Sequence, residues 1–183
     1  MRQAVIQTFS GRGFDLFSPN PAEIRIVDIA HSLSMLCRFG GHCKAFYSVA
    51  EHCVHVSKLV PLSDAMWGLF HDASEAYCGD MLSPLKPFRP EHREMEGEIQ
   101  RAVAVAFNLQ LPIPASVHLA DDAMLATERR QIMERHSDVV WGRGNSKPAS
   151  VRLSCWSSPV AEWKFMERFY EIRQGLRQDA FNF

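Results

Sequence analysis

The stretch LFHDASEAYCGDMLSPLK, residues 69–86, decides the fold. It places the pair His71-Asp72 inside a segment whose apolar residues follow a helical spacing from residue 63 or 64 onward. Gly79 ends the segment, because glycine readily adopts the left-handed conformation that closes many helices. The stretch therefore predicts a helix that carries an imidazole and a carboxylate next to each other.

Two helices are predicted before this one. Apolar residues at spacings of three and four begin at Ile26 and stop before the glycines at positions 40 and 41. Ser48 and Glu51 form a capping box, in which each side chain is expected to accept a hydrogen bond from the backbone N–H of the other. The second helix therefore starts at this box and runs to about residue 60.

Three more helices are predicted after it. Residues 81–90 (MLSPLKPFRP) contain three prolines and predict a loop without regular structure. Helical spacing follows over residues 91–107 and 115–135, and residues 141–150 predict a polar loop. A last helix begins at a Ser-Pro pair, which is typical of a helix start, and covers residues 158–178.

The sequence as a whole predicts an all-α fold with a single domain over residues 1–183. The core helices and the candidate site fall within residues 26–136. Residues 1–22 contain glycines, prolines and scattered aromatic residues. They predict an irregular N-terminal arm with one short strand around residues 5–9.

Composition and charge argue against several classes of protein. The net charge of −1 gives no strongly basic face for duplex nucleic acid. No apolar run approaches about 18 residues, so no contact with a membrane is expected. Five cysteines without a CxxC pair predict reduced thiols in a cytoplasmic protein.

Histidines and acids recur in an order that indicates a metal site. His52 lies in the second predicted helix, His71-Asp72 in the third, and Asp121 beside Asp122 in the fifth. Helical bundles build metal sites from side chains on facing helices. Two imidazoles with carboxylates suit manganese, iron, cobalt or zinc better than calcium. Each residue alone is more often a core or surface residue, so the prediction depends on the combination.

Glu75 extends this pattern. It lies four residues after His71 and therefore on the same helix face. Hydrolysis of a phosphate ester needs a Lewis acid and a nearby activated water. A carboxylate in this place is expected to handle protons near the ion without being a ligand.

The order H…HD…D resembles the signature of HD-domain phosphohydrolases, a superfamily of helical bundles. The surrounding residues resemble one branch, the small bacterial 5′-deoxynucleotidases and the related phage dATP triphosphohydrolases. The matching stretches are LCRFGGH (36–42), YSVAEHCVHVS (47–57), LFHDASEAYCGDMLSPLK (69–86) and ADDAMLATE (120–128). They are well separated and together span about half of the chain.

The resemblance implies a set of metal ligands and a catalytic acid. The ligands correspond to His52, His71, Asp72 and Asp121, and the catalytic acid corresponds to Glu75. Asp121 is preferred to its neighbour because the family motif is an Ala-Asp pair. The metal is expected to be cobalt, manganese, zinc or iron, with magnesium as a candidate second ion.

The resemblance also implies residues that bind the substrate. Arg38 matches the phosphate-binding arginine, and Phe39 matches the aromatic residue that packs against the nucleoside, which is typically tryptophan in the relatives. Pro84 and Lys86 match the Pro-x-Lys motif that closes the pocket, and Asp80 stands in the loop before it. The role of His42 has two alternatives: its side chain either contacts phosphate or caps its own loop.

These observations predict a metal-dependent phosphohydrolase of deoxynucleotides. It would be either a 5′-deoxynucleotidase acting on a dNMP or a triphosphohydrolase acting on a dNTP such as dATP, since the same residues serve both reactions. The expected partner is a small deoxynucleotide, and the protein is expected to form a homo-oligomer by analogy with the family. The alternative is a non-catalytic helical nucleotide-binding module with a structural metal ion.

Overall fold

A computed structural model describes residues 4–135 and 146–180 of the chain. Helices account for 61% of the described residues and strands for 5%, so the predicted all-α class is confirmed. Residues 1–3 of the predicted arm, residue 136 of the predicted core and residues 141–145 of the predicted polar loop lie outside the described residues. No helix in the described part of the chain is long and apolar enough to cross a membrane.

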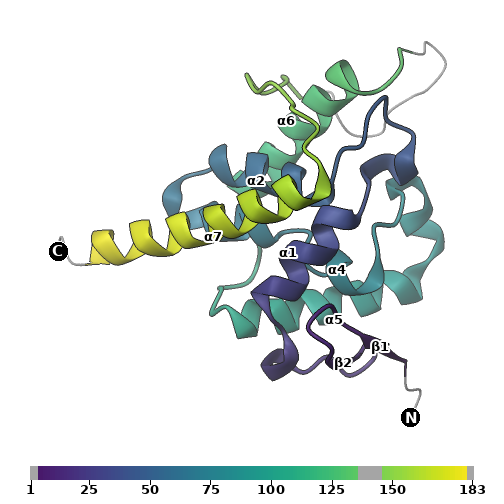
Figure 1. Ribbon diagram of the computed structural model, residues 1–183, viewed down its shortest axis with the longest axis vertical. Helices are drawn as coiled ribbons and strands as arrows, with labels where there is room; N and C mark the ends of the chain where they lie inside the picture. The colour runs from purple at the N-terminus through teal and green to yellow at the C-terminus, as the bar shows by residue number, and fades with distance from the viewer. Residues whose placement is uncertain (1–3, 136–145, 181–183) are drawn as a thin grey trace.

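The elements follow one another along the chain in an order close to the predicted one (Figure 1). The α-helices are α1 (Ile26–Met35), α2 (Val49–Lys58), α3 (Ala65–Phe70), α4 (Glu75–Cys78), α5 (Pro90–Ala106), α6 (Ala115–Gln131) and α7 (Ser158–Ala180). The strands are β1 (Val5–Gln7) and β2 (Gly13–Asp15). Short 3₁₀ helices are η1 (Pro21–Glu23), η2 (Arg38–Gly41), η3 (Leu62–Asp64) and η4 (Ser83–Phe88).

The main core forms where α7 lies across α1 and α2 (Figure 1). Phe165 and Phe169 of α7 pack their rings against Phe70 at the end of α3, with centroids 6.1 and 5.9 Å apart. Ile29 of α1 and Cys53 of α2 are fully buried in the same cluster. Since α2 and α3 both contact this core, the ends of α2 and α3 that carry the histidines are held in place relative to each other.

A smaller apolar cluster places α6 against α2 and α3. Val117 and Met124 of α6 are buried together with Val56 of α2 and Trp67 of α3. The Trp67 indole N–H also donates to the carbonyl oxygen of Gln110 at 2.7 Å, so its polar atom is satisfied. This packing directs one face of α6 toward α2.

In the described part of the N-terminal arm, residues 4–22, the predicted strand is present as β1, but a second strand makes the arm more regular than predicted. β1 and β2 form an antiparallel hairpin, in which Ile6 pairs with Phe14. Phe14 is fully buried and stacks on Tyr77 of α4 at 4.2 Å. The Asp28 carboxylate of α1 accepts hydrogen bonds from the backbone N–H and the hydroxyl of Ser10 in the hairpin turn. The arm is ordered because its one large buried side chain belongs to the core.

The predicted capping box at the start of α2 forms only in part. The Ser48 hydroxyl accepts from the backbone N–H of Glu51 at 3.1 Å, as predicted. The Glu51 carboxylate does not complete the box, because it accepts three backbone N–H groups from the segment before α7. These donors are Ser154, Cys155 and Trp156, at 3.0, 3.0 and 2.6 Å. Glu51 therefore fixes the entry of α7 to the core.

The predicted helix around the His-Asp pair is two helices, α3 and α4, separated by residues 71–74. Within this break the backbone hydrogen bonds span three residues rather than four, as in the bond from the Ala73 N–H to the Phe70 carbonyl at 3.0 Å. The Gln100 side chain of α5 takes up both groups of the missing bond. It donates to the Phe70 carbonyl at 2.7 Å and accepts from the Ser74 N–H at 3.0 Å.

The proline-rich residues 81–90 also differ from the prediction, because they include the 3₁₀ helix η4. At its ends, Leu85 donates to the Leu82 carbonyl and Arg89 donates to the Lys86 carbonyl. Pro84 lies in the first turn, where no backbone N–H is needed, whereas Pro87 lies inside the helix and interrupts its bonds there. Proline therefore excludes an α-helix here but not a short 3₁₀ helix.

Candidate metal centre

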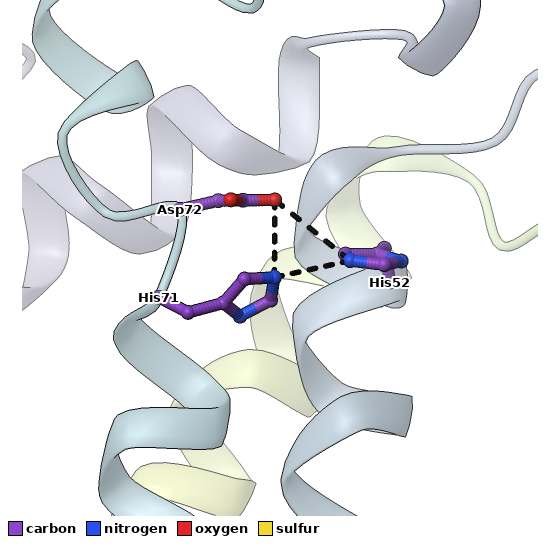
Figure 2. A group of neighbouring side chains, drawn as sticks. All are labelled: His52, His71 and Asp72. Carbon is purple, nitrogen blue, oxygen red and sulfur yellow. Dashed lines mark hydrogen bonds and ion pairs between the residues drawn. The ribbon is translucent and has the colours of Figure 1, made fainter. Parts of the chain in front are cut away.

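Three of the predicted ligands face one another (Figure 2). His52 lies on α2, and His71 and Asp72 lie in the break between α3 and α4. The two Nε2 atoms of the histidines are 3.1 Å apart, and His71 Nε2 is 3.2 Å from the Asp72 carboxylate. His52 Nε2 is 3.8 Å from the same carboxylate oxygen. One ligand atom from each residue therefore lies within 4.8 Å of the others, which is the spacing of a metal site.

Asp121 joins this group from α6. Its Oδ1 atom lies 3.2 Å from His52 Nε2. The side chain can reach α2 because the α6 face with Val117 and Met124 packs on α2 and α3. The structure thus brings the four predicted ligands together from three separate parts of the chain.

The orientation of both imidazole rings is fixed by their outer nitrogen atoms. His71 Nδ1 lies 2.9 Å from the carbonyl oxygen of Gly68, which can only accept, so Nδ1 carries the proton. His52 Nδ1 lies 2.6 Å from Oε1 of Glu128. A carboxylate that holds the outer nitrogen of a ligating histidine is a common support of metal sites. Both Nε2 atoms then face the centre of the group.

Electrostatics keep the carboxylates of the site charged. Burial raises the pKa of Asp72, but His71 and His52 outweigh it and hold the pKa far below the usual range. Burial likewise raises the pKa of Asp121, and its hydrogen bond with His52 outweighs that effect. Two imidazole nitrogens and two ionised carboxylates form a donor set that fits a divalent transition metal ion.

Neighbouring groups shift the pKa of His52 in opposite directions. Burial and the nearby Arg38 lower the pKa of His52. Glu128 and Asp121 raise it by a larger amount, so that the net pKa is about 9. The ring is fully buried. The surroundings of His52 thus favour positive charge at the centre of the site.

Glu128 is a site residue that the sequence reasoning did not identify. Its carboxylate is fully buried on α6, and it bonds His52 with one oxygen and the Arg38 guanidinium with the other, the latter at 3.1 Å. Burial raises the pKa of Glu128, but Arg38 and His52 outweigh it and lower the pKa. The available signal was spacing, since Glu128 follows Asp121 by seven residues, or about two helical turns, on the same face.

Arg38 lies beside the metal ligands in η2. Its second terminal nitrogen is 3.5 Å from the Asp72 carboxylate. Burial lowers the pKa of Arg38, but Glu128 and Asp72 outweigh it and raise the pKa, so the guanidinium is charged. The guanidinium also lies 5.4 Å from the centroid of the Phe39 ring. Phe39 has a φ of 58°, a left-handed conformation that side chains other than glycine rarely adopt.

Glu75, the predicted catalytic acid, is buried at the start of α4. Its Oε1 lies 3.6 Å from the Lys86 ammonium, which also donates to Glu96 of α5 at 2.9 Å. Its Oε2 is buried and has no hydrogen-bond partner among the described residues. Burial, followed by the charges of Asp72 and Asp80, raises the pKa of Glu75 well above the usual range. The surroundings of Glu75 therefore favour its protonated form.

The other predicted substrate residues differ in how closely they approach the centre. Asp80 is half-buried. Burial raises its pKa, and the nearby positive charges of Arg38 and Lys86 oppose this increase. His42 and Pro84 are exposed. No hydrogen bond or ion pair joins the His42 side chain to the metal ligands within the described residues, and its backbone N–H closes η2 by donating to Phe39. The structure therefore brings Asp80 near the site, but shows no contact of His42 or Pro84 with the ligands.

Comparison with known proteins finds relatives that align with most of the chain. The uncharacterised protein YfdR of Escherichia coli K12 is 46% identical over 177 residues, which cover 96% of this chain and 98% of the relative. An uncharacterised protein of Rhodobacter capsulatus is 32% identical over 169 residues, which cover 83% of this chain and 85% of the relative. No protein-family profile matches the chain. These names state no activity, so the function has to be argued from the site.

Proposed function

We propose that this chain, which belongs to the same family as the Escherichia coli protein YfdR, is a metal-dependent phosphohydrolase of the HD-domain type that acts on deoxynucleotides. One observation supports this most. His52, His71 and Asp72 lie close enough to hold one metal ion, Asp121 lies 3.2 Å from His52, and a half-buried arginine and a buried glutamate lie near them. Ligands alone would suit many roles, but Arg38 can bind phosphate oxygens and Glu75 can transfer a proton, which are two functions that assist phosphate ester hydrolysis.

Each group beside the ligands has a role in this reaction. A divalent metal ion held by the four ligands would withdraw charge from a phosphoryl oxygen and lower the pKa of a bound water from 15.7 to about 7. The planar fork of Arg38 is suited to bind two phosphate oxygens. Lys86, a mobile ammonium group, would neutralise a further oxygen. Because Glu128 and Asp72 already hold Arg38, little side-chain freedom is lost when phosphate binds.

Glu75 would act on the proton of the attacking water. Its Oε2 is buried and has no partner among the described residues, so this oxygen is available to a substrate or a water. The raised pKa of Glu75 brings it closer to neutrality, where proton exchange is most effective. Lys86, 3.6 Å from Oε1, keeps the other oxygen in an ionic contact.

The substrate is either a dNMP or a dNTP, and the metal is cobalt, manganese, zinc or iron, with magnesium as a candidate second ion. Arg38 and Lys86 serve a single phosphate as well as the first phosphate of a chain. Phe39 lies next to Arg38, so it is placed to contact the nucleoside of a phosphate bound there. The same arrangement is compatible with both substrates.

The alternative is a helical nucleotide-binding module in which the metal ion is only structural. Structural metal sites are usually closed by cysteine and histidine. The presence of a buried glutamate with an oxygen that lacks a partner favours the enzyme, since such a group costs stability and a binding module gains nothing from it.

The variant Glu75→Gln tests this choice, with Glu98→Gln, an exposed glutamate of α5, as the control. If Glu75 acts on the water proton, Glu75→Gln should retain the metal ion and bind nucleotide, but its turnover should fall about 10²- to 10⁴-fold. Glu98→Gln should turn over like the wild type. Equal turnover of the wild type and Glu75→Gln at full metal content would contradict the proposed role.

A further inference from the structure

The break between α3 and α4 lies at the residues that carry the proposed chemistry. His71 and Asp72 lie in it, and Glu75 begins the next helix. In an uninterrupted α-helix the Ser74 N–H would donate to the Phe70 carbonyl, four residues earlier. Both groups are instead bonded to the side-chain amide of Gln100, which comes from α5. A side chain inserted in this way is one of the known causes of a break in a helix.

The break changes which residues share a face. In an α-helix, residues three apart are offset by about 60° around the axis, whereas in a 3₁₀ turn they are aligned. The Glu75 N–H donates to the Asp72 carbonyl at 3.0 Å, which is the bond of a 3₁₀ turn. The bonds of Ala76 to Ala73 and of Tyr77 to Ser74 span three residues as well. The tightened segment therefore aligns Asp72, a proposed ligand, with Glu75, the proposed proton-handling group.

We infer that Gln100 is a positioning residue, which keeps residues 71–74 in 3₁₀ turns and so sets the direction of Asp72 relative to Glu75. Among the described residues, the side-chain hydrogen bonds of Gln100 go to backbone groups and not to the ligand atoms, so we infer that it acts through the backbone. Its amide matches the break because it supplies an acceptor to the Ser74 N–H and a donor to the Phe70 carbonyl, whose other bond comes from the Ala73 N–H of the 3₁₀ turn. The role of Glu75 in this inference rests on the proposed function, whereas the effect on the ligands does not.

The chain contains a matched control for the two hydrogen bonds of the Gln100 amide. Gln131, at the end of α6, also bonds two backbone groups with its amide, donating to the Val151 carbonyl at 2.6 Å and accepting from the Leu153 N–H at 3.1 Å. These groups belong to the segment before α7 and not to the break. Gln131→Met therefore removes two side-chain-to-backbone hydrogen bonds of the same kind as Gln100→Met does, but leaves residues 71–74 unchanged.

The experiment compares the wild type, Gln100→Met and Gln131→Met by titration with Co²⁺, followed by its visible absorption. Loss of a group that supports metal ligands typically lowers affinity about 10- to 100-fold, so we expect Gln100→Met to raise the dissociation constant of Co²⁺ at least about tenfold. Gln131→Met should bind Co²⁺ like the wild type. At saturating Co²⁺, Gln100→Met should lower kcat more than it changes KM, because Glu75 is turned away from the reacting water.

A folded Gln100→Met protein with the Co²⁺ affinity of the wild type would overturn the inference, as would an equal loss in Gln131→Met. If Gln100→Met does not fold, Gln100→Asn replaces it, since the shorter amide cannot span both backbone groups, and the same two results decide. The Co²⁺ titration uses no nucleotide. A wild type that hydrolyses no nucleotide would therefore contradict the proposed function, while the titration would still decide the role of Gln100.

Discussion

Replacing Gly68 with alanine tests how the helices hold the two histidines. A β-carbon at Gly68 of α3 would lie 2.7 Å from the Cα atom of Ser57 in α2, and 3.2 Å from the Val60 side chain. Ordinary contacts begin at 3.4 Å, so α2 and α3 would have to separate by about 0.7 Å. Rotation of a side chain cannot relieve this contact, because Ser57 meets it with its backbone.

Gly97→Ala is the matched control, because Gly97 also lies inside a helix, α5, and its added β-carbon would meet only the Arg101 side chain at 3.7 Å. Both substitutions gain about 1 kcal/mol of helix propensity, which cancels in the comparison. The difference is then the cost of overpacking, about 1–3 kcal/mol. For a domain of this size, it corresponds to a Tm lower by about 2–12 °C for Gly68→Ala than for Gly97→Ala.

Thermal unfolding followed by circular dichroism measures this difference. The Gly68 carbonyl also accepts the hydrogen bond of His71, so Gly68→Ala should weaken Co²⁺ binding as well, whereas Gly97→Ala should not. Equal Tm values for the two variants would refute the reasoning, because they would show that α2 and α3 are not in contact at this glycine.

Three further predictions concern the site. Asp121→Asn should lower metal content and turnover by orders of magnitude, because Asp121 lies 3.2 Å from His52. Asp122→Asn should have a mild effect, because neighbouring helical residues point about 100° apart, and equal losses in the two variants would contradict this prediction. Glu128→Gln should raise the Co²⁺ dissociation constant about 10- to 100-fold, whereas Glu162→Gln, which alters a histidine–glutamate pair on α1 and α7, should not. Because burial and nearby carboxylates raise the pKa of Glu75, kcat/KM should fall with decreasing pH through a midpoint above the ordinary value of about 4.3, and a midpoint at or below that value would exclude Glu75 as the base.

Local patterns predicted the position of most α-helices, but not the division of the helix around His71 into α3 and α4. The capping serine Ser48 starts α2, and the proline-flanked residues 91–107 and 115–135 correspond to α5 and α6. Ligand candidates were also recognisable, because the order His52, His71-Asp72 and Asp121 uses residue types that bind metals. The structure brings them near one another, but His71 and Asp72 lie in the break between two helices rather than on a helix, as was predicted.

Contacts between distant parts of the chain were beyond such patterns. Glu51 was predicted to cap its own helix, but its carboxylate accepts hydrogen bonds from three backbone N–H groups more than a hundred residues away. Nothing near His71 predicts the break after α3, since its cause is Gln100 on another helix. Glu128 was overlooked because one glutamate among exposed charges carries no mark of burial, and only the fold brings it to His52.

The central claim is that this metal centre hydrolyses deoxynucleotides, and a product assay on the purified wild type tests it most directly. The protein is loaded in turn with Co²⁺, Mn²⁺, Zn²⁺, Fe²⁺ or Mg²⁺ and incubated with each dNMP and each dNTP, and the release of phosphate or triphosphate is measured. We expect hydrolysis of at least one of these nucleotides that requires a transition metal ion and is lost in Glu75→Gln. A wild-type protein that holds one metal ion per chain and releases no product from any of these nucleotides would contradict the claim.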